Sequence, residues 1–269
     1  MKKIRSENGV EYLQFGNLSN EKGVIHTFST RTGGVSGSYY KSMNLGFNRG
    51  DPDNNVTENY KLFCQALGIE PEQLVFASQT HSTIIRRVGK ESKGEDLYHP
   101  VPSTGYDGLA TSEEGVLLAT LYADCVPLYF YDPVRKAVAL SHAGWRGTLD
   151  NMAGITVRFL AKEFGSEPGD LLMGIGPSIG VCCFEVGDEV AGPFRELPAE
   201  IISGAITEEL HIDLQIINRR MAIKEGVKDE NIETAGICTS CNSDWLFSHR
   251  ASGGERGSLC AILGIKDNV

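Results

Sequence analysis

Three short segments place a histidine or a cysteine at the end of an apolar run. They are Gln79-Thr80-His81-Ser82, Ala123-Asp124-Cys125-Val126-Pro127, and residues 141–148, which include His142. Two histidines and one cysteine are a plausible open zinc site, with the fourth position left for water or substrate. Cys125 and His142 could instead be a nucleophile and its base. The residue types alone leave both chemistries open.

The stretch over residues 116–148 predicts how Cys125 and His142 come together. A strand over 116–122 ends just before Cys125, and further strands follow, the last of which ends at Ser141-His142. Two adjacent strands joined by a short turn can bring both side chains near one edge of a sheet. The glycine-rich segment after His142 and the start of the next helix supply backbone N–H groups, where an anion would bind. Arg146, in that segment, adds a guanidinium suited to phosphate or carboxylate.

Apolar periodicity predicts an α+β protein. Runs of adjacent strands with only occasional helices favour this class over a regular βαβ repeat, and strands that are apolar on both faces should be covered on both sides. The expected strands span residues 24–28, 74–79, 83–88, 116–122, 128–131, 137–141 and 171–175. The expected helices span residues 55–67, 148–164 with Thr148 as N-cap, and 214–223 with Asp213 as cap.

Length and charge exclude several classes of protein. The 269 residues carry a formal net charge of −10, which argues against a nucleic-acid-binding surface. The N-terminal segment lacks the apolar region of a secretory signal, and the longest apolar run is too short to span a membrane. We therefore expect a cytoplasmic protein whose seven cysteines are thiols. The sequence gives no signal for an oligomeric interface.

Other motifs give weaker signals. Residues 174–180 superficially resemble a phosphate loop, but they lack its lysine and contain Pro177, so a turn lining a pocket is favoured. Cys238-Thr239-Ser240-Cys241 is a lone CxxC motif, which favours a structural turn, with redox chemistry or adventitious metal binding as alternatives. The vicinal Cys182 and Cys183 are expected to serve packing. His249, Arg250 and Arg256 could reach a pocket.

Taken together, these motifs resemble the YfiH/YlmD-like laccase-domain family, also called the multicopper polyphenol oxidase or purine nucleoside phosphorylase family. The resemblance covers essentially the whole chain from about residue 24, and the His142-Ala-Gly-Trp-Arg-Gly segment is its most specific part. The matching pieces begin at Arg31 (RTGGVS), Met43 (MNLG), Gln79 (QTHS), Asp107 (DGLAT), Ala123 (ADCVP), Ser141 (SHAGWRGT), Gly174 (GIGPSIG) and Cys238 (CTSC).

The resemblance implies a single α+β domain over residues 1–269. Its two packed mixed β-sheets would carry helices on their outer faces, in four layers ordered αββα. It also implies Zn²⁺ held by His81, Cys125 and His142. The implied substrates are purine nucleosides and phosphate: phosphorolysis of adenosine, inosine, guanosine and S-methyl-5′-thioadenosine, with deamination of adenosine.

Roles for further residues rest on charge and on position in these motifs. We assign Arg31, Asn44, Gln79 and Arg146 as candidates for binding substrate or phosphate. Other zinc deaminases use zinc-activated water and a carboxylate that shuttles protons. Asp124 is the carboxylate nearest to the metal set in sequence, and we expect it to take that role.

The histidine count tests the name of the family. A multicopper oxidase needs a mononuclear and a trinuclear copper site, and hence many histidines in H-x-H motifs. This chain has six histidines and no such motif, so multicopper chemistry is close to excluded. A single His2Cys copper site is conceivable, but zinc is favoured because no methionine that could serve as an axial ligand lies near these motifs.

Two other functions stay open. One is a metal-independent cysteine hydrolase that uses Cys125 as nucleophile and His142 as base. The other is a non-catalytic binder of a small molecule.

Overall fold

The chain forms two six-stranded mixed sheets in the computed structural model, which describes residues 1–94 and 105–267. The first sheet has the order β1 (Lys2–Arg5), β2 (Glu11–Gln14), β3 (Val24–Ser29), β12 (Leu259–Ile265), β7 (Leu117–Tyr122), β4 (Leu74–Phe76). The second has the order β11 (Ile232–Thr234), β10 (Leu172–Ile175), β8 (Val126–Asp132), β9 (Ala137–Ala143), β6 (Gly108–Thr111), β5 (Ile85–Arg87). Most pairs are antiparallel, and the pairs β4/β7, β5/β6 and β10/β11 are parallel.

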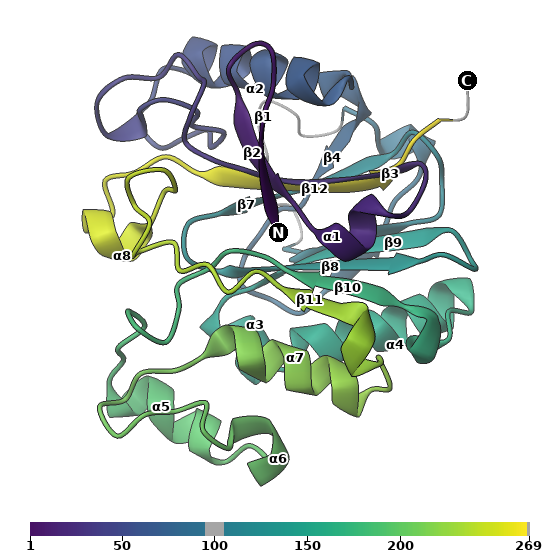
Figure 1. Cartoon of the computed structure of the whole chain (residues 1–269), viewed down its shortest axis with the longest axis vertical. Coiled ribbons are helices and arrows are strands. Elements are labelled where there is room, and N and C mark those ends of the chain that lie inside the picture. Colours follow the sequence, from purple (N-terminus) through teal and green to yellow (C-terminus); the bar gives the residue numbers. More distant parts are fainter. Residues whose placement is uncertain (95–104, 268–269) are drawn as a thin grey trace.

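Helices cover the outer face of each sheet (Figure 1), so the layers run helix, sheet, sheet, helix. Helix α2 packs on the first sheet, and α4 and α7 pack on the second. The α-helices are α1 (Gly16–Ser19), α2 (Asp53–Leu67), α3 (Trp145–Leu149), α4 (Met152–Phe164), α5 (Asp188–Arg195), α6 (Ala199–Ile202), α7 (Leu214–Lys224) and α8 (His249–Ser252). The α+β class and the αββα layers expected from the sequence are confirmed.

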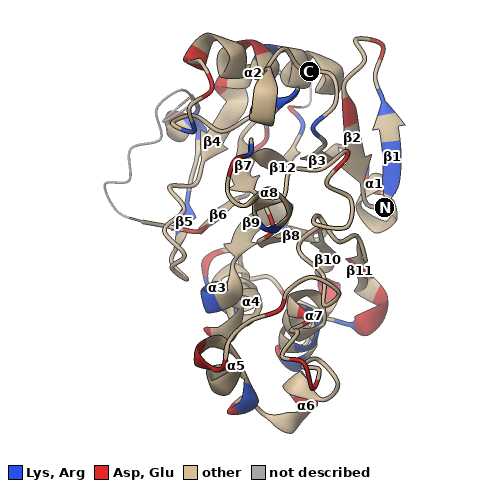
Figure 2. Ribbon diagram, turned by 90° about the vertical axis from the view of Figure 1, so that its left-hand side faces the viewer, with Lys and Arg blue, Asp and Glu red and all other residues tan. Residues whose placement is uncertain are grey.

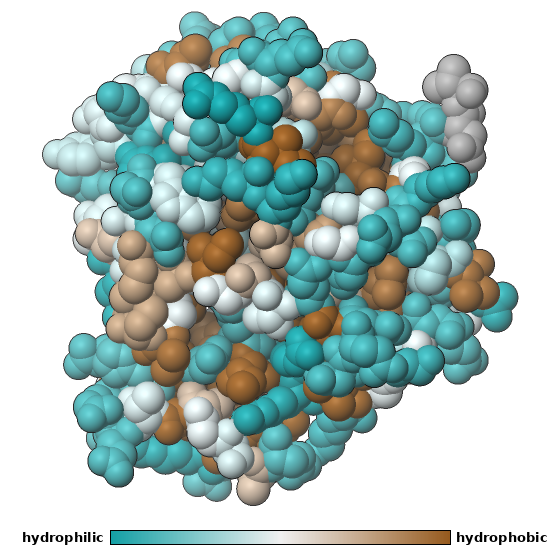
Figure 3. All heavy atoms as spheres, in the orientation of Figure 1, coloured by the Kyte–Doolittle hydropathy of each residue, from teal (hydrophilic) through white to brown (hydrophobic). Residues whose placement is uncertain are grey.

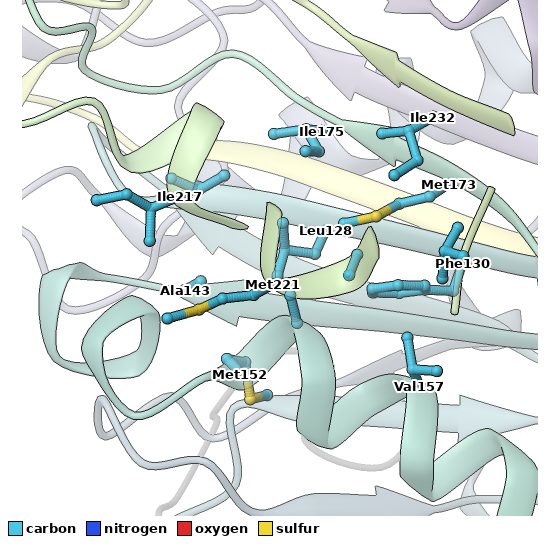
Figure 4. Close-up of a cluster of buried hydrophobic side chains, with 14 of the residues drawn as sticks. Leu128, Phe130, Ala143, Met152, Val157, Met173, Ile175, Ile217, Met221 and Ile232 are labelled. Atoms are coloured by element: carbon cyan, nitrogen blue, oxygen red, sulfur yellow. The ribbon is translucent and has the colours of Figure 1, made fainter. Parts of the chain in front are cut away.

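Three buried clusters hold these layers together. One fills the space between the sheets with side chains such as Phe28, Tyr129 and Leu263. The second joins α2 to the outer face of the first sheet. The third joins α4 and α7 to the second sheet, where Leu128 and Phe130 of β8 meet Val157 and Met221 (Figure 4). Both faces of β8 are therefore buried, which explains its nearly continuous apolar sequence.

Two of the three expected helices are confirmed. Helix α2 ends at Leu67 as expected, and the Asp213 side chain caps α7 by accepting a hydrogen bond from Ile216 N. The third helix, expected over 148–164, is found as α4 over Met152–Phe164, but its expected start is wrong because the chain first forms α3 and then restarts. Asn151 has a φ of 62° and caps α4, accepting a hydrogen bond from Gly154 N. Thr148 is not the cap: its hydroxyl accepts from the Asn218 side chain inside the fold.

The surface seen in Figure 3 is mostly hydrophilic, and hydrophobic side chains are interspersed among polar ones. Within residues 1–94 and 105–267, no helix is long and apolar enough to cross a membrane.

Candidate metal and substrate site

Two connections that cross from one sheet to the other carry the candidate ligands His81 and Cys125. The first runs from β4 to β5 through His81, and the second runs from β7 to β8 through Cys125. His142 lies in β9, beside β8 in the second sheet, where Pro127 pairs with His142 and Val126 with Ala143. The antiparallel register therefore puts the start of β8 next to the end of β9. The expected proximity of Cys125 and His142 at one edge of a sheet is confirmed.

The ligand atoms of His81, Cys125 and His142 lie within 4.8 Å of one another. The two imidazole rings meet edge to face, with centroids 5.1 Å apart. His142 is buried, Cys125 is half-buried and His81 is exposed. All three line a pocket of about 530 Å³, a size typical of small-molecule sites. Figure 2 looks onto this end of the molecule, where α8 lies over the ends of strands from both sheets.

Asp107 holds this group of side chains together. Its carboxylate is fully buried and accepts hydrogen bonds from His142 Nδ1 at 2.7 Å and from the backbone N–H of His81 at 3.0 Å. The N–H groups of Thr80 and Ser82 donate to its other oxygen. One carboxylate thus fixes both the turn that carries His81 and the ring of His142. The sequence alone did not indicate this role, although Asp107 opens the DGLAT motif.

These contacts shift the pKa values of all three groups. Burial opposes ionisation of Asp107, but hydrogen bonds from His142, Thr80 and Ser82 lower its pKa to about 2. Burial alone would raise the pKa of the Cys125 thiol, yet His142 and His81 lower it to about 6. Burial alone would lower the pKa of His142, but Cys125 and Asp107 raise it to about 9. The protein therefore stabilises a thiolate at Cys125.

Gly144 leaves space for the three ligands to converge. A Cβ at this position would lie 2.8 Å from His81 Cδ2 and 3.3 Å from Cys125 Sγ. The backbone of Gly144 is extended, with φ −70°, so any residue could adopt it. The glycine is needed here for space and not for its backbone freedom.

The donor set fits a metal ion. Nδ1 of His142 is hydrogen-bonded to Asp107, so Nε2 is the ring nitrogen that is available to a metal ion in the pocket. Metal-bound histidines usually donate the N–H of their other ring nitrogen to a carboxylate, a backbone carbonyl or water. Two imidazoles and one thiolate leave one position open, which is the arrangement of a catalytic zinc site.

Asp124 lines the pocket, but its carboxylate is already engaged. One oxygen accepts from Thr239 Oγ1 at 2.6 Å, and the other accepts from the backbone N–H of Arg250 at 2.7 Å. The residue has a φ of 86°, in the left-handed region that few non-glycine residues adopt. Asp124 therefore links the connection between β7 and β8, just before Cys125, to the C-terminal segments that form the wall of the pocket.

Gln79 and Asn44 hold backbone in place. The Gln79 amide pairs with both the N–H and the C=O of Leu121, at 2.6 and 2.8 Å, and lines the pocket. Asn44 is fully buried outside the pocket lining, and its side chain bonds Gly46, Asp51 and the N–H of Ser258. Asn44 thus supports a lining segment from behind.

The structure does not bring Arg31 and Arg146 into this pocket. Arg31 donates to the backbone of Lys41 and Ser243, lies over the Phe247 ring and lines a neighbouring pocket. Arg146 is exposed, and its guanidinium lies 4.1 Å from the centre of the Trp145 ring. Closeness to His142 in sequence misleads here, because Arg146 lies in α3 outside the lining of the pocket.

The pocket takes its positive charge from Arg49, Arg250 and Arg256. Arg250 donates to the carbonyls of Cys183 and Glu185. The expectation that His249, Arg250 and Arg256 reach a pocket is confirmed. Arg49 was not singled out, because it follows the MNLG motif in a polar loop and no local spacing links it to the other site residues. The turn expected at residues 174–180 also reaches the pocket, through Ile179.

A second group of metal-capable side chains lies beside this wall. The sulfur atoms of Cys182, Cys183, Cys238 and Cys241 all lie within 4.8 Å of one another. The expectation that Cys182 serves packing is wrong, since its side chain is exposed. Among the described residues, neither of the two metal-capable groups contains the many histidines that a trinuclear copper centre needs.

The fold packs two mixed sheets between layers of helices, and the His2Cys group lies at the edge of the sheets. Other proteins share this α+β fold. The family model described as multi-copper polyphenol oxidoreductase laccase matches residues 25–266. The chain therefore belongs to this laccase-domain family, as its motifs suggested.

Individual relatives are similar over almost their whole length. The purine nucleoside phosphorylase YlmD of Bacillus subtilis is 34% identical over 253 residues, which cover 92% of this chain and 91% of that protein. The adenosine deaminase RL5, from an unknown prokaryotic organism, is 32% identical over 239 residues, covering 87% and 91%. The crystal structure of the Bacillus licheniformis hypothetical protein YfiH superposes with a TM-score of 0.90 at 33% identity, covering 98% and 97%.

Proposed function

We propose that this protein is a zinc-dependent purine nucleoside phosphorylase that also deaminates adenosine. Adenosine, inosine, guanosine and S-methyl-5′-thioadenosine are its proposed substrates. The observation that carries the proposal is the convergence of His81, Cys125 and His142 in one pocket, with Asp107 orienting His142. Relatives named purine nucleoside phosphorylase and adenosine deaminase support the substrate class.

His81, Cys125 and His142 would hold the zinc ion. When bound, zinc supplies Lewis-acid polarisation and makes water ionise near neutral pH, as deamination at C6 of adenine requires. Asp107 accepts the Nδ1 proton of His142, so Nε2 is the atom that would bind the metal once its own proton is displaced. Its bonds to the 80–82 turn fix the position of His81 at the same time.

We assign Asp124 as a positioning residue instead of a proton shuttle. Both of its oxygens accept hydrogen bonds, from Thr239 and from the backbone of Arg250. A carboxylate held in this way orients the wall of the pocket and keeps Cys125 in place. Gln79 acts similarly through the backbone of Leu121.

Phosphate would bind at Arg256 and Arg49, and not at Arg31 or Arg146. Nε of Arg256 is buried and has no hydrogen-bond partner within the described part of the chain. Burial and the nearby charge of Arg49 lower the pKa of Arg256 to about 10, so it stays protonated at neutral pH. An anion between the two guanidinium groups would satisfy Nε and relieve their repulsion.

The rival function is a cysteine hydrolase with Cys125, His142 and Asp107 as its triad. The 2.7 Å contact between Asp107 and His142 would orient the base in such an enzyme as well. His81 distinguishes the two, because a zinc enzyme needs it as a metal ligand, whereas in a Cys-His-Asp triad it would only help to lower the pKa of Cys125. Replacing His81 by alanine should abolish both activities of a zinc enzyme and leave a hydrolase active.

The test is to incubate the purified protein with adenosine and phosphate and to separate the products. Phosphorolysis gives adenine and ribose 1-phosphate, deamination gives inosine and ammonia, and simple hydrolysis gives adenine and free ribose. Zinc content is measured on the same preparation, with and without chelator. Products that depend on bound zinc and are lost in Cys125→Ala support the proposal. A Cys125→Ala variant that stays zinc-loaded and active contradicts it.

A further inference from the structure

Two loops that are distant in sequence bring four cysteines together beside the pocket. Cys182 and Cys183 follow β10, and Cys238 and Cys241 form the CxxC motif after β11. The two loops are joined by a parallel bridge between Ser178 and Cys238. The lone CxxC motif therefore has a second pair of thiols opposite it, but the pair is vicinal in sequence.

The spacing of the sulfur atoms suits a single metal ion. Zn–S bonds of about 2.3 Å in tetrahedral geometry put any two sulfur atoms about 3.8 Å apart. Cys241 Sγ lies 3.4 Å from both Cys182 Sγ and Cys183 Sγ, and no pair among the four exceeds 4.8 Å. Small movements of side chains would bring all four sulfur atoms to the ideal separation.

Backbone N–H groups already point at one of these sulfur atoms. Gly180 N lies 3.2 Å from Cys238 Sγ, and Cys241 N lies 3.5 Å from it. Hydrogen bonds to an ionised acceptor are stronger than bonds to a neutral one. The loops are therefore arranged to stabilise a thiolate at Cys238, which is the form that binds a metal ion.

We propose that Cys182, Cys183, Cys238 and Cys241 bind a second zinc ion, separate from the ion at His81, Cys125 and His142. Four protein ligands leave no open position, so this site is structural and not catalytic. The inference does not depend on the proposed function, because the four cysteines lie outside the His2Cys group.

The proposed zinc would fasten one wall of the pocket. Phe184, next to Cys183, lines the pocket, and Arg250 donates to the carbonyl of Cys183. On the other loop, Thr239 lies inside the CxxC motif and donates to Asp124. Each loop of the four-cysteine group thus contacts a residue that lines the pocket, so loss of this zinc should loosen the pocket and raise KM more than it lowers kcat.

The first test counts metal ions per chain. The full-length protein is kept reduced and anaerobic, loaded with zinc, desalted and analysed for metal content. We expect about two zinc ions for the unmodified protein and about one for the double variant Cys182→Ser/Cys241→Ser. These two thiols are exposed, which makes their replacement mild. Cys64→Ala, which removes a buried thiol in α2, is the control and should still bind two.

Cobalt substitution keeps the proposal testable if the double variant does not fold. Cobalt bound by four thiolates has intense sulfur-to-metal charge-transfer bands that differ from those of a His2Cys site. The Cys125→Ser variant should keep the four-thiolate spectrum. A single metal ion per chain that disappears in Cys125→Ser overturns the proposal. Four thiols that stay fully reactive toward a thiol reagent after zinc loading overturn it too.

Discussion

The Asp107 carboxylate and the His142 imidazole form a 2.7 Å hydrogen bond in the buried part of the site. The backbone of the same two residues is also joined, because His142 N donates to Asp107 O at 2.7 Å. This double link follows from the antiparallel pairing of β6 with β9, in which Gly108 lies opposite Ser141. The position of Asp107 beside His142 is therefore a property of the sheet itself.

Replacing Asp107 by asparagine should weaken zinc binding and activity by about 10- to 100-fold, because His142 would lose the partner that fixes its tautomer. Competition with a chelator of known affinity measures the effect. Asp132 offers a matched control, since it is equally buried but caps the turn at the far end of β8. Asp132→Asn should reduce stability and leave zinc affinity unchanged. Equal zinc affinity in Asp107→Asn and the unmodified protein would refute the role of Asp107.

Gly144→Ala should lower kcat/KM by roughly 100-fold, because the added methyl group would displace His81 or Cys125 from its position. Steady-state assays with saturating zinc measure the loss. Gly192 in α5 is the matched control, since a Cβ there meets nothing within 4 Å. Gly192→Ala should keep full activity and stabilise the fold by about 0.5–1 kcal/mol. An active Gly144→Ala variant would show that the ligands need no such close approach.

Arg256→Ala should raise KM for phosphate by about 10- to 100-fold, the loss expected for a hydrogen bond to a charged group. Deamination of adenosine uses no phosphate, so its rate should change little in the same variant. The rate of deamination therefore distinguishes the loss of a residue that binds phosphate from a general collapse of the pocket. Arg146→Ala, which removes a guanidinium outside the pocket, should leave both reactions intact. If the KM for phosphate rises only in Arg146→Ala, phosphate binds at α3 and not at Arg256.

The buried side chain of His26 should make the free energy of unfolding depend on pH. Burial lowers the pKa of His26 to about 4, although a hydrogen bond to the backbone of Phe15 and the negative charge of Glu233 favour the charged form. Between pH 6.5 and 4 the unfolded chain therefore binds more protons than the folded one, so stability falls as the pH drops through this window. From pH 7 to pH 5 the loss from this residue should be about 2 kcal/mol.

The measurement is urea unfolding at both pH values, for the unmodified protein and for His26→Gln. Glutamine cannot be protonated, but its amide oxygen can accept the Phe15 N–H that His26 Nε2 now accepts at 3.0 Å. Other titrating groups cancel in the comparison. The same loss of stability in both proteins would show that His26 does not cause it.

The sequence predicted the parts of the site that depend on local pattern. Strand ends and a short turn place Cys125 beside His142, and apolar runs on both faces predict covered sheets. The motifs then supplied the family and the layer order, which are confirmed. The domain bounds at residues 1 and 269, the cytoplasmic location and the roles of individual site residues stay predictions.

What the sequence did not predict depends on contacts between distant segments. The phosphate candidates Arg31 and Arg146 were chosen for their place in motifs, but neither lines the pocket, because each makes contacts outside it. Arg49 and Arg256 both line the pocket, although about two hundred residues separate them in the chain. No local spacing in the sequence therefore identifies them. For the same reason, the sequence did not predict that Cys182 and Cys241 lie next to each other.

Strand β12 lies between β3 and β7 in the first sheet, and its Cys260 N–H bonds Ser29 across 231 residues. A ribosome must therefore synthesise nearly all of the described chain before the middle of this sheet can be completed. Until then the edges of β3 and β7 stay open for pairing with other strands. Pairing at such long sequence separation slows folding. The nascent protein thus has a long interval in which chaperones would be needed to prevent aggregation.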